Sequence, residues 1–408
     1  MRVTRGGPLW SVAVLVVVAA GCGTAVPSPS PTLQATRIPA TPSPAATASA
    51  VTHPTPDTTP RLTPSPGLID LDVEAQRVPT QFAGRVATFV SLGDQIAWSG
   101  GQGEDDNDLY RYIQGASEPE LLYANPDRNS VLTSIAGGNA GYVFTEERWI
   151  DGDPHGWRLL YLPAPGTEPL ILDESTDDRL IAPTVAMNDT WIAWEAVHGT
   201  PTDRSNELRV ARVADPLHPQ TLLDYAGRDV YLEFPRLWGD ELWYGIVANN
   251  WVAGTEAPRV EMIDLSRPDD PPATFGVDQR AFMPAPGKDI VAWKSGGDAT
   301  LSALNSGALT IYTRASGQIE VLPIPGEERI AERISYPSVG NRYVAWWDDI
   351  RQRLYVYDYV ERQFRRIAER EPTAEEFFGK PSISGDLLVY LHILSESERY
   401  LEWTTLPS

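Results

Sequence analysis

The stretch "PSVGNRYVAWWDD", residues 337–349, joins a proline-led segment, a Gly-Asn turn and an apolar run that closes on an aromatic residue. The same phrase occurs as "SLGDQIAWSGG" from residue 91, "MNDTWIAWEAV" from 187 and "APGKDIVAWKSG" from 285. Seven aromatic residues close such phrases, at intervals of 44 to 53 residues: Trp98, Phe144, Trp194, Tyr244, Trp293, Trp346 and Tyr390. A near-constant period in this range is typical of a repeat architecture.

Each copy of the repeat contains further short segments in the same order. After the phrase come a loop, a third segment such as "RLYVYDY" from residue 353, and a fourth such as "FRRIA" from 364. Within the third segment, apolar Leu354 and Val356 alternate with Tyr355 and Tyr357, which is the period of a β-strand. Four short antiparallel strands at such a period predict one blade of a β-propeller. The segments are β-branched, aromatic and too short for helical repeats.

We therefore predict an all-β chain with a seven-bladed β-propeller over residues 68–408. Six or eight blades remain as alternatives, because the second copy, "GGNAGYVFTEE", is the least regular. The seventh copy has no fourth segment, whereas residues 68–79, "LIDLDVEAQRVP", precede the first copy unassigned. We expect residues 68–79 to complete the last blade, because closing the ring removes exposed sheet edges. The seven recurring aromatics are then expected in the core.

The first 21 residues have the pattern of a signal peptide. Arg2 and Arg5 precede an apolar run from Leu9 to Ala20, which is too short to span a bilayer comfortably. The run ends in "VAAGC", which resembles the bacterial lipobox. This resemblance implies that Cys22, the sole cysteine of the chain, becomes the lipidated first residue of an exported protein at the extracytoplasmic face of a bacterial membrane. The alternative is an ordinary secretory signal with an incidental cysteine.

Residues 22–67 differ in composition from the rest of the chain. They are rich in Pro, Ser, Thr and Ala and nearly uncharged, so they cannot bury a core. We expect a disordered, semi-rigid stalk that holds the propeller away from the membrane. Residues 23–408 contain no cysteine, so the fold cannot depend on a disulfide.

The charge of the chain argues against nucleic acid as a partner. The formal net charge is −22, and lysine occurs only at Lys288, Lys294 and Lys380. Binding phosphates needs a clustered positive surface, which the sequence lacks. We expect the acidity to serve solubility.

The repeat resembles TolB-like and other YWTD- or WD40-like β-propellers of exported bacterial proteins. The resemblance lies in the "I-A-W" strand after a Gly/Asp turn and in the "L-Y-V-Y-D" strand that follows, and it covers most of residues 86–408. It implies an architecture and no activity. The S-P-D-G turn of TolB and its preceding α/β domain are absent from the sequence, so TolB's role is not carried over.

One acidic loop is a candidate metal site. In "GEDDND" the side chains of Asp105, Asp106 and Asp108 could offer oxygen ligands to Ca²⁺. The spacing does not match an EF-hand loop, and a solvated loop is the alternative interpretation. Asp348 and Asp349 occupy the equivalent loop of copy six. The five histidines have no metal-binding spacing, so we expect no cofactor.

The stretch "YGIVANNWVAG" is a candidate binding loop through Asn249, Asn250 and Trp251, because a surface aromatic could stack on a glycan or a peptide. The alternative is a hairpin whose Trp packs on its own blade. No G-x-S-x-G nucleophile motif occurs. We expect a monomer that binds a protein, peptide or glycan of the cell envelope without catalysis, on the loop face or in the central channel. The main alternative is a glycoside hydrolase or lyase with paired carboxylates, for which Glu195 and Asp348 are examples.

Overall fold

The computed structural model describes most of the residues after position 56, in one compact unit within Thr52–Ser408. The described ranges are 57–62, 68–71, 73–79, 88–100, 107–150, 153–176, 182–200, 203–225, 230–248, 258–296, 307–322, 335–348, 353–367, 377–395 and 398–408. They contain strands and one short 3-10 helix, η1 (Val277–Gln279). No helix in these ranges has the length and apolarity to cross a membrane.

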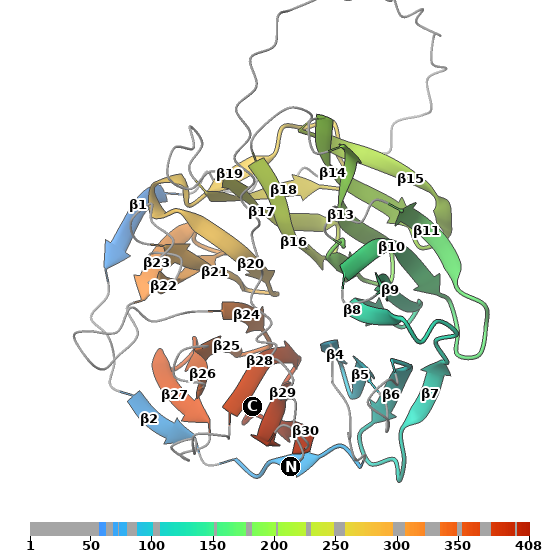
Figure 1. Cartoon of the computed structure of the whole chain (residues 1–408). Coiled ribbons are helices and arrows are strands. Elements are labelled where there is room, and N and C mark those ends of the chain that lie inside the picture. The colour runs from blue at the N-terminus through green and yellow to red at the C-terminus, as the bar shows by residue number, and fades with distance from the viewer. Residues whose placement is uncertain are drawn as a thin grey trace, which may run out of the picture. The chain divides into compact units, whose positions relative to one another are not determined.

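The strands form seven sheets, which confirms the predicted seven-bladed β-propeller (Figure 1). Blade one contains β4 (Thr88–Leu92), β5 (Gln95–Ser99), β6 (Leu109–Ile113) and β7 (Glu120–Tyr123). Blade two contains β8 (Ser130–Gly138), β9 (Gly141–Ile150), β10 (Asp153–Leu162) and β11 (Leu170–Ser175). Blade three contains β12 (Val185–Met187), β13 (Trp191–Thr200), β14 (Asp203–Arg212) and β15 (Asp215–Asp224). Blade four contains β16 (Val230–Trp238), β17 (Glu241–Ala248), β18 (Arg259–Asp264) and β19 (Ala273–Phe275).

The last three blades each take a strand from the N-terminal part of the chain. Blade five contains β20 (Ala281–Pro286), β21 (Ile290–Gly296), β22 (Gly307–Thr313), β23 (Gln318–Leu322) and β1 (Asp57–Leu62). Blade six contains β24 (Ser335–Val339), β25 (Tyr343–Asp348), β26 (Arg353–Asp358), β27 (Gln363–Ile367) and β2 (Leu68–Leu71). Blade seven contains β28 (Phe377–Ser384), β29 (Leu387–Ser395), β30 (Glu398–Thr405) and β3 (Gln76–Arg77).

The first strand of each blade is its innermost strand. Each innermost strand contacts the innermost strand of the next blade, and β28 contacts β4, so the seven sheets close a ring. Serine hydroxyls join some of these neighbours. Ser338 Oγ accepts a hydrogen bond from the Ile383 N–H (3.0 Å), and Ser382 Oγ accepts one from the Ser91 N–H (2.9 Å).

The hydrophobic core lies between neighbouring blades. One cluster, for example, combines Ile290 and Leu309 of blade five with Trp346 and Phe364 of blade six. All seven recurring aromatics of the sequence are at most 1% exposed, as predicted. Each buries a large apolar area between two sheets, and for this reason the same phrase recurs in every blade.

The strands β1, β2 and β3 form an N-terminal belt along the outer edges of blades five, six and seven (Figure 1). β3 pairs antiparallel with β30, and the Val78 N–H donates to the Leu401 carbonyl at 2.9 Å. β1 and β2 pair parallel with β23 and β27.

This arrangement differs from the sequence expectation in two ways. Asp57–Leu62 falls within the residues assigned to the stalk, yet it is a strand. Leu68–Leu71 lies on blade six, and only Gln76–Arg77 of the segment 68–79 extends the sheet of blade seven. The physical reason is that an edge strand offers unpaired backbone groups to any extended segment, whatever its side-chain pattern.

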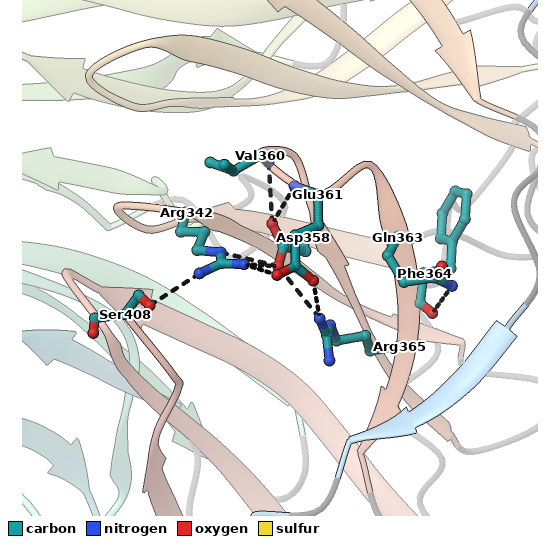
Figure 2. A network of polar contacts seen from close by, with 8 residues as sticks. All are labelled: Arg342, Asp358, Val360, Glu361, Gln363, Phe364, Arg365 and Ser408. Carbon is teal, nitrogen blue, oxygen red and sulfur yellow. Dashed lines mark hydrogen bonds and ion pairs between the residues drawn. The ribbon is translucent and has the colours of Figure 1, made fainter.

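A buried carboxylate joins blade six to the C-terminal residue (Figure 2). The side chain of Asp358 is 0% exposed and accepts hydrogen bonds from Arg342 Nε (2.9 Å) and from the backbone N–H groups of Val360 and Glu361. Arg342 Nη1 also donates to the Ser408 carbonyl at 2.9 Å. Burial raises the pKa of Asp358, but these hydrogen bonds and the charge of Arg342 outweigh it, so the pKa is lowered overall.

Candidate functional site

The innermost strands of blades four, five and six share a β-bulge at an X-Pro pair. In each, the pair stands opposite a single residue of the second strand, because the register shifts there. The pairs are Phe234-Pro235, Met283-Pro284 and Tyr336-Pro337. A related shift in β28 lies between Phe378 and Pro381, next to Lys380-Pro381.

The first residue of each of these three pairs has a left-handed backbone. The φ angles are 54° at Phe234, 55° at Met283 and 53° at Tyr336. Such angles are uncommon for a residue with a bulky side chain and cost about 1–3 kcal/mol each. The same left-handed backbone at one position of three successive blades means that the fold maintains this bulge despite its strain energy. All three lie on innermost strands, where backbone strain of this kind often marks a functional site.

Two of these side chains meet across the ring. The rings of Phe234 and Tyr336 pack edge to face, with centroids 6.0 Å apart. Their strands belong to blades four and six, so this contact reaches past blade five. Lys380 of blade seven places Nζ 5.5 Å from the centroid of the Tyr336 ring and donates to Thr88 Oγ1 of blade one at 3.3 Å. The side chains of β4, β16, β24 and β28 therefore converge on the axis of the propeller.

Three charged side chains lie near the same aromatic pair. Glu233 and Arg236 flank the bulge of β16, and Glu195 comes from β13 of blade three. Glu195 Oε1 accepts a weak hydrogen bond from the Thr184 N–H at 3.4 Å. Among the described residues, no donor reaches Oε2, which is shielded from solvent. We call Glu195, Glu233, Phe234, Arg236, Tyr336 and Lys380 the axial cluster.

Burial dominates the protonation of both acids in the axial cluster. It raises the pKa of Glu195 to about 8, and the nearby Glu233 carboxylate adds to the rise while Arg236 opposes it. Burial alone raises the pKa of Glu233 to about 7. Both side chains are therefore largely or partly neutral at pH 7, when each can donate as well as accept a hydrogen bond.

Burial acts on the two cations in the opposite direction. It lowers the pKa of Lys380 to about 8, with a further contribution from the positive charge of Arg236. The pKa of Arg236 is lowered by burial too, against the attraction of Glu195 and Tyr336. A guanidinium stays charged under any such shift, so the axial cluster carries net positive charge near neutral pH.

The residues of the axial cluster are neither fully buried nor fully exposed. Each of its six residues keeps part of its surface accessible to solvent, although burial governs the pKa of its acids and bases. Such a site can bind a polar ligand group, because hydrogen bonds and charge interactions are stronger away from bulk water.

The residues proposed from the sequence lie elsewhere or outside the described ranges. Asp108, at 7% exposure, accepts hydrogen bonds on Oδ1 from the Asn125 N–H (2.8 Å) and from Arg128 Nη1 (3.2 Å). The candidates that fall outside the described residues are Cys22, Asp105, Asp106, Asn249, Asn250, Trp251 and Asp349. Within the described residues, no group of three His, Cys, Asp or Glu side chains is arranged to hold a metal ion.

Of the two carboxylates named as examples of enzyme candidates, the structure brings only Glu195 to the axis. Asp348 is 2% exposed at the end of β25, opposite Arg353 of β26. The sequence analysis missed Glu233, Phe234, Arg236, Tyr336 and Lys380. A signal was present in the segments "FPRL", "YPSV" and "KPSI", where a large residue precedes the proline, whereas copy three has Ala182 in "APTV".

Comparisons with known proteins define the fold and leave the activity open. No family model matches the chain, and no curated protein matches it. Many solved structures do. The propeller domain of the Trilobed protease from Pyrococcus furiosus is 10% identical with a TM-score of 0.54, and the match covers 79% of this chain and 93% of that one.

Two further structures are similar at the same level. A YCF48 structure with D1 peptide bound is 11% identical with a TM-score of 0.52, and the match covers 85% of this chain and 98% of that one. A prolyl endopeptidase is 9% identical with a TM-score of 0.54, and the match covers 76% of this chain. This chain spans only 46% of that endopeptidase. At such identities the likeness shows a shared β-propeller fold alone.

Proposed function

We propose that this protein is a lipid-anchored, extracytoplasmic propeller that binds a peptide segment of a partner protein at the axial cluster without catalysis. The observation that carries the proposal is the convergence of Phe234, Tyr336 and Lys380, from three blades, on the axis. Two of the three hold a left-handed backbone at the bulge of their strands. Aromatic and cationic groups that gather while remaining partly accessible favour recognition of a ligand.

The pKa values favour binding over acid–base catalysis. A glycosidase pair needs one carboxyl group kept protonated and one kept ionised, so that their environments push the two pKa values apart. Here burial raises the pKa of both Glu195 and Glu233. Neither environment holds its carboxyl group fully ionised at pH 7, whereas such a mechanism needs one carboxylate kept ionised.

The likeness to the YCF48 structure is consistent with the proposal. In that structure a propeller that this chain nearly spans in full has a peptide bound. A chain of this fold can therefore hold a peptide, although function does not follow from fold.

The glycoside hydrolase or lyase remains the second candidate, because Glu195 and Glu233 interact with each other near the axis. Aryl glycosides of several sugars, offered to the purified full-length chain, test it. Turnover that Glu195→Gln and Glu233→Gln both abolish would establish the enzyme and displace the binding proposal.

The binding proposal is tested by selecting a random peptide library on the immobilised full-length chain. We expect enrichment of a peptide family on the wild type and on Trp238→Ala, a matched aromatic change at the exposed last residue of β16. Tyr336→Ala should lose that family. Absence of enrichment on the wild type, or undiminished enrichment on Tyr336→Ala, would contradict the proposal.

We further propose that Cys22 provides the only attachment to the membrane and that the protein acts as a monomer. Net charge −22 supports a soluble propeller that does not bind nucleic acid.

A further inference from the structure

Two partly buried cations of the axial cluster, Arg236 and Lys380, form no ion pair with a carboxylate among the described residues, although Glu195 attracts Arg236 at longer range. Arg236 Nη1 donates to the carbonyl of its neighbour Pro235 at 2.9 Å, and Lys380 Nζ donates to the Thr88 hydroxyl. No carboxylate within the described ranges forms an ion pair with either side chain. Because removing a charge from water is costly unless it is paired, this arrangement is expected only where another group completes it.

Other arginines of the protein form ion pairs with carboxylates, whereas Arg236 and Lys380 form none within the described part of the chain. Arg209 contacts both Asp173 (3.0 Å) and Glu207 (2.7 Å), and Arg314 contacts Glu241 at 2.6 Å. The chain has 55 acidic residues against 33 lysines and arginines. In such an acidic protein, two partly buried cations without a carboxylate ion pair among the described residues differ from these paired arginines, and the charge of Arg236 lowers the pKa of Lys380.

The two nearby acids do not fill the role of counter-ion at neutral pH. Burial raises the pKa of Glu195 and of Glu233, which keeps these groups wholly or partly protonated. In that form a carboxyl group can donate a hydrogen bond to an incoming anion. The rings of Phe234 and Tyr336 offer apolar contact beside the cations.

We propose that the axial cluster recognises a carboxylate group of the bound peptide, between Arg236 and Lys380. This inference rests on the proposed function of peptide binding and names the chemical group that is recognised. A guanidinium fork and an ammonium group both form charge-assisted hydrogen bonds to a carboxylate, and these are stronger than neutral ones. The carboxylate is supplied either by the C-terminus of the peptide or by an acidic side chain.

Three short peptides distinguish these sources by isothermal titration of the full-length chain at pH 7. They are acetyl-Ala-Ala-Phe with a free C-terminus, the same peptide as its C-terminal amide, and acetyl-Ala-Asp-Ala amide. We expect one carboxylate peptide to bind at least about tenfold more tightly than the uncharged amide. Binding of the first would assign the C-terminus, and binding of the third would assign an acidic side chain.

Lys380→Met and Arg236→Met should each remove this preference for the carboxylate. Lys288→Met is the matched control, because Lys288 is exposed in the turn between β20 and β21. If the amide binds as tightly as both carboxylate peptides, carboxylate recognition is wrong while peptide binding stands. If none of the three peptides binds and the library selection also enriches nothing, both carboxylate recognition and the proposed peptide binding are wrong.

The pH profile supplies a second readout. Glu195 of β13 and Tyr336 of β24 interact with the charge of Arg236. The Tyr336 ring and the hydroxyl of Thr88 in β4 lie next to Lys380. Glu233 of β16 acts on Glu195. From pH 7 to pH 9, Lys380 loses its proton and both glutamates ionise, so the affinity for the carboxylate peptide should fall several-fold. An affinity that is constant or rises over this range would overturn the inference.

Discussion

Phe234 and Tyr336 lie edge to face with an interplanar angle of 83°, although blade five separates their strands. Both residues precede a proline, and both hold a φ angle close to 54°. The shared bulge therefore directs two aromatic side chains from separate blades to one place. Lys380 and Arg236 reach the same place, which makes the axis the most distinctive chemical environment among the described residues.

The left-handed backbone of Phe234 predicts a reversed order of stability between two variants. In a strand, Gly is normally less stable than Ala, but at φ 54° the Cβ atom costs about 1 kcal/mol. We expect Phe234→Gly to be more stable than Phe234→Ala by about 1 kcal/mol in urea unfolding. At exposed Leu121 of β7, the control, Ala should be the more stable of the two. The usual order at both positions would mean that the bulge is unstrained.

The stability of the protein should fall as the pH rises from about 5 to 8. Glu195 and Glu233 have an ordinary pKa of 4.5 when unfolded but about 8 and about 7 when folded, so the folded state binds more protons in this window. A pKa difference of one between the two states corresponds to about 1.4 kcal/mol. Relative to wild type, Glu195→Gln should therefore gain about 2–4 kcal/mol between pH 5 and pH 8. The free energy of unfolding of both proteins, measured in urea from pH 5 to pH 8, tests this. If the two free energies change in parallel with pH, the pKa of Glu195 is not raised by folding.

Lys380 predicts a rise of stability at higher pH. Its pKa falls from 10.5 in the unfolded chain to about 8 in the folded protein, so the unfolded state binds more protons between these values. Relative to Lys380→Met, the wild type should therefore gain stability as the pH rises from 8 to 10. Unfolding followed by tryptophan fluorescence at both pH values measures it, with Lys288→Met expected to match the wild type.

The buried carboxylate of Asp358 predicts a large effect of Arg342 on stability. Arg342→Met leaves a fully buried carboxylate without its main partner and releases the contact to Ser408, which should cost about 2–3 kcal/mol (Figure 2). Arg267→Met, which breaks an exposed pair with Asp264, should cost less than about 1 kcal/mol. Urea unfolding of the two variants measures both losses. Equal losses would mean that the hydrogen bonds of Asp358 add no stability beyond that of an exposed ion pair.

The N-terminal belt predicts that the outer strand of the last blade depends on residues 68–79. Val78 is 2% exposed against blades one and seven, and its N–H bonds to Leu401. Deleting 68–79 removes this strand and Leu71, so amide exchange in β30 should become faster by at least about tenfold. Exchange in β13 of blade three is the internal reference. Unchanged protection of β30 would show that β3 contributes nothing to closing the last blade.

The lipidation of Cys22 is tested by Cys22→Ser. We expect the variant to be exported and released from the membrane fraction, because the acyl chains supply the attachment. A membrane-bound variant would indicate another mode of attachment.

The sequence was sufficient to predict the blades because each repeat buries an aromatic at the same place. Trp346 and its counterparts are visible as a period in the sequence, since burying a large aromatic imposes the same constraint on every copy. The belt was not predictable in this way. β1 and β2 join their sheets in parallel through backbone hydrogen bonds, which "DTTPRL" and "LIDL" do not reveal in their side chains.

The axial cluster could not be predicted from the sequence, because its residues come together only when the ring of blades closes. Phe234 and Tyr336 are roughly a hundred residues apart in the sequence, and Glu195 and Lys380 are still further apart. Copy four contributes three of these side chains, and copies three, six and seven contribute one each. At the corresponding positions of the inner strands other copies have small residues such as Ala182 or Ser338. The convergence of the axial cluster follows from the angular spacing of seven blades around an axis, which no local pattern contains.

Hydrogen–deuterium exchange of the full-length chain with and without a saturating library-selected peptide tests the central claim most directly. The claim that the peptide binds at the axial cluster predicts slower exchange in β16, β24 and β28, the innermost strands of blades four, six and seven. Slower exchange confined to the outer strands β7, β11, β15 and β19, with these three innermost strands unchanged, would contradict it.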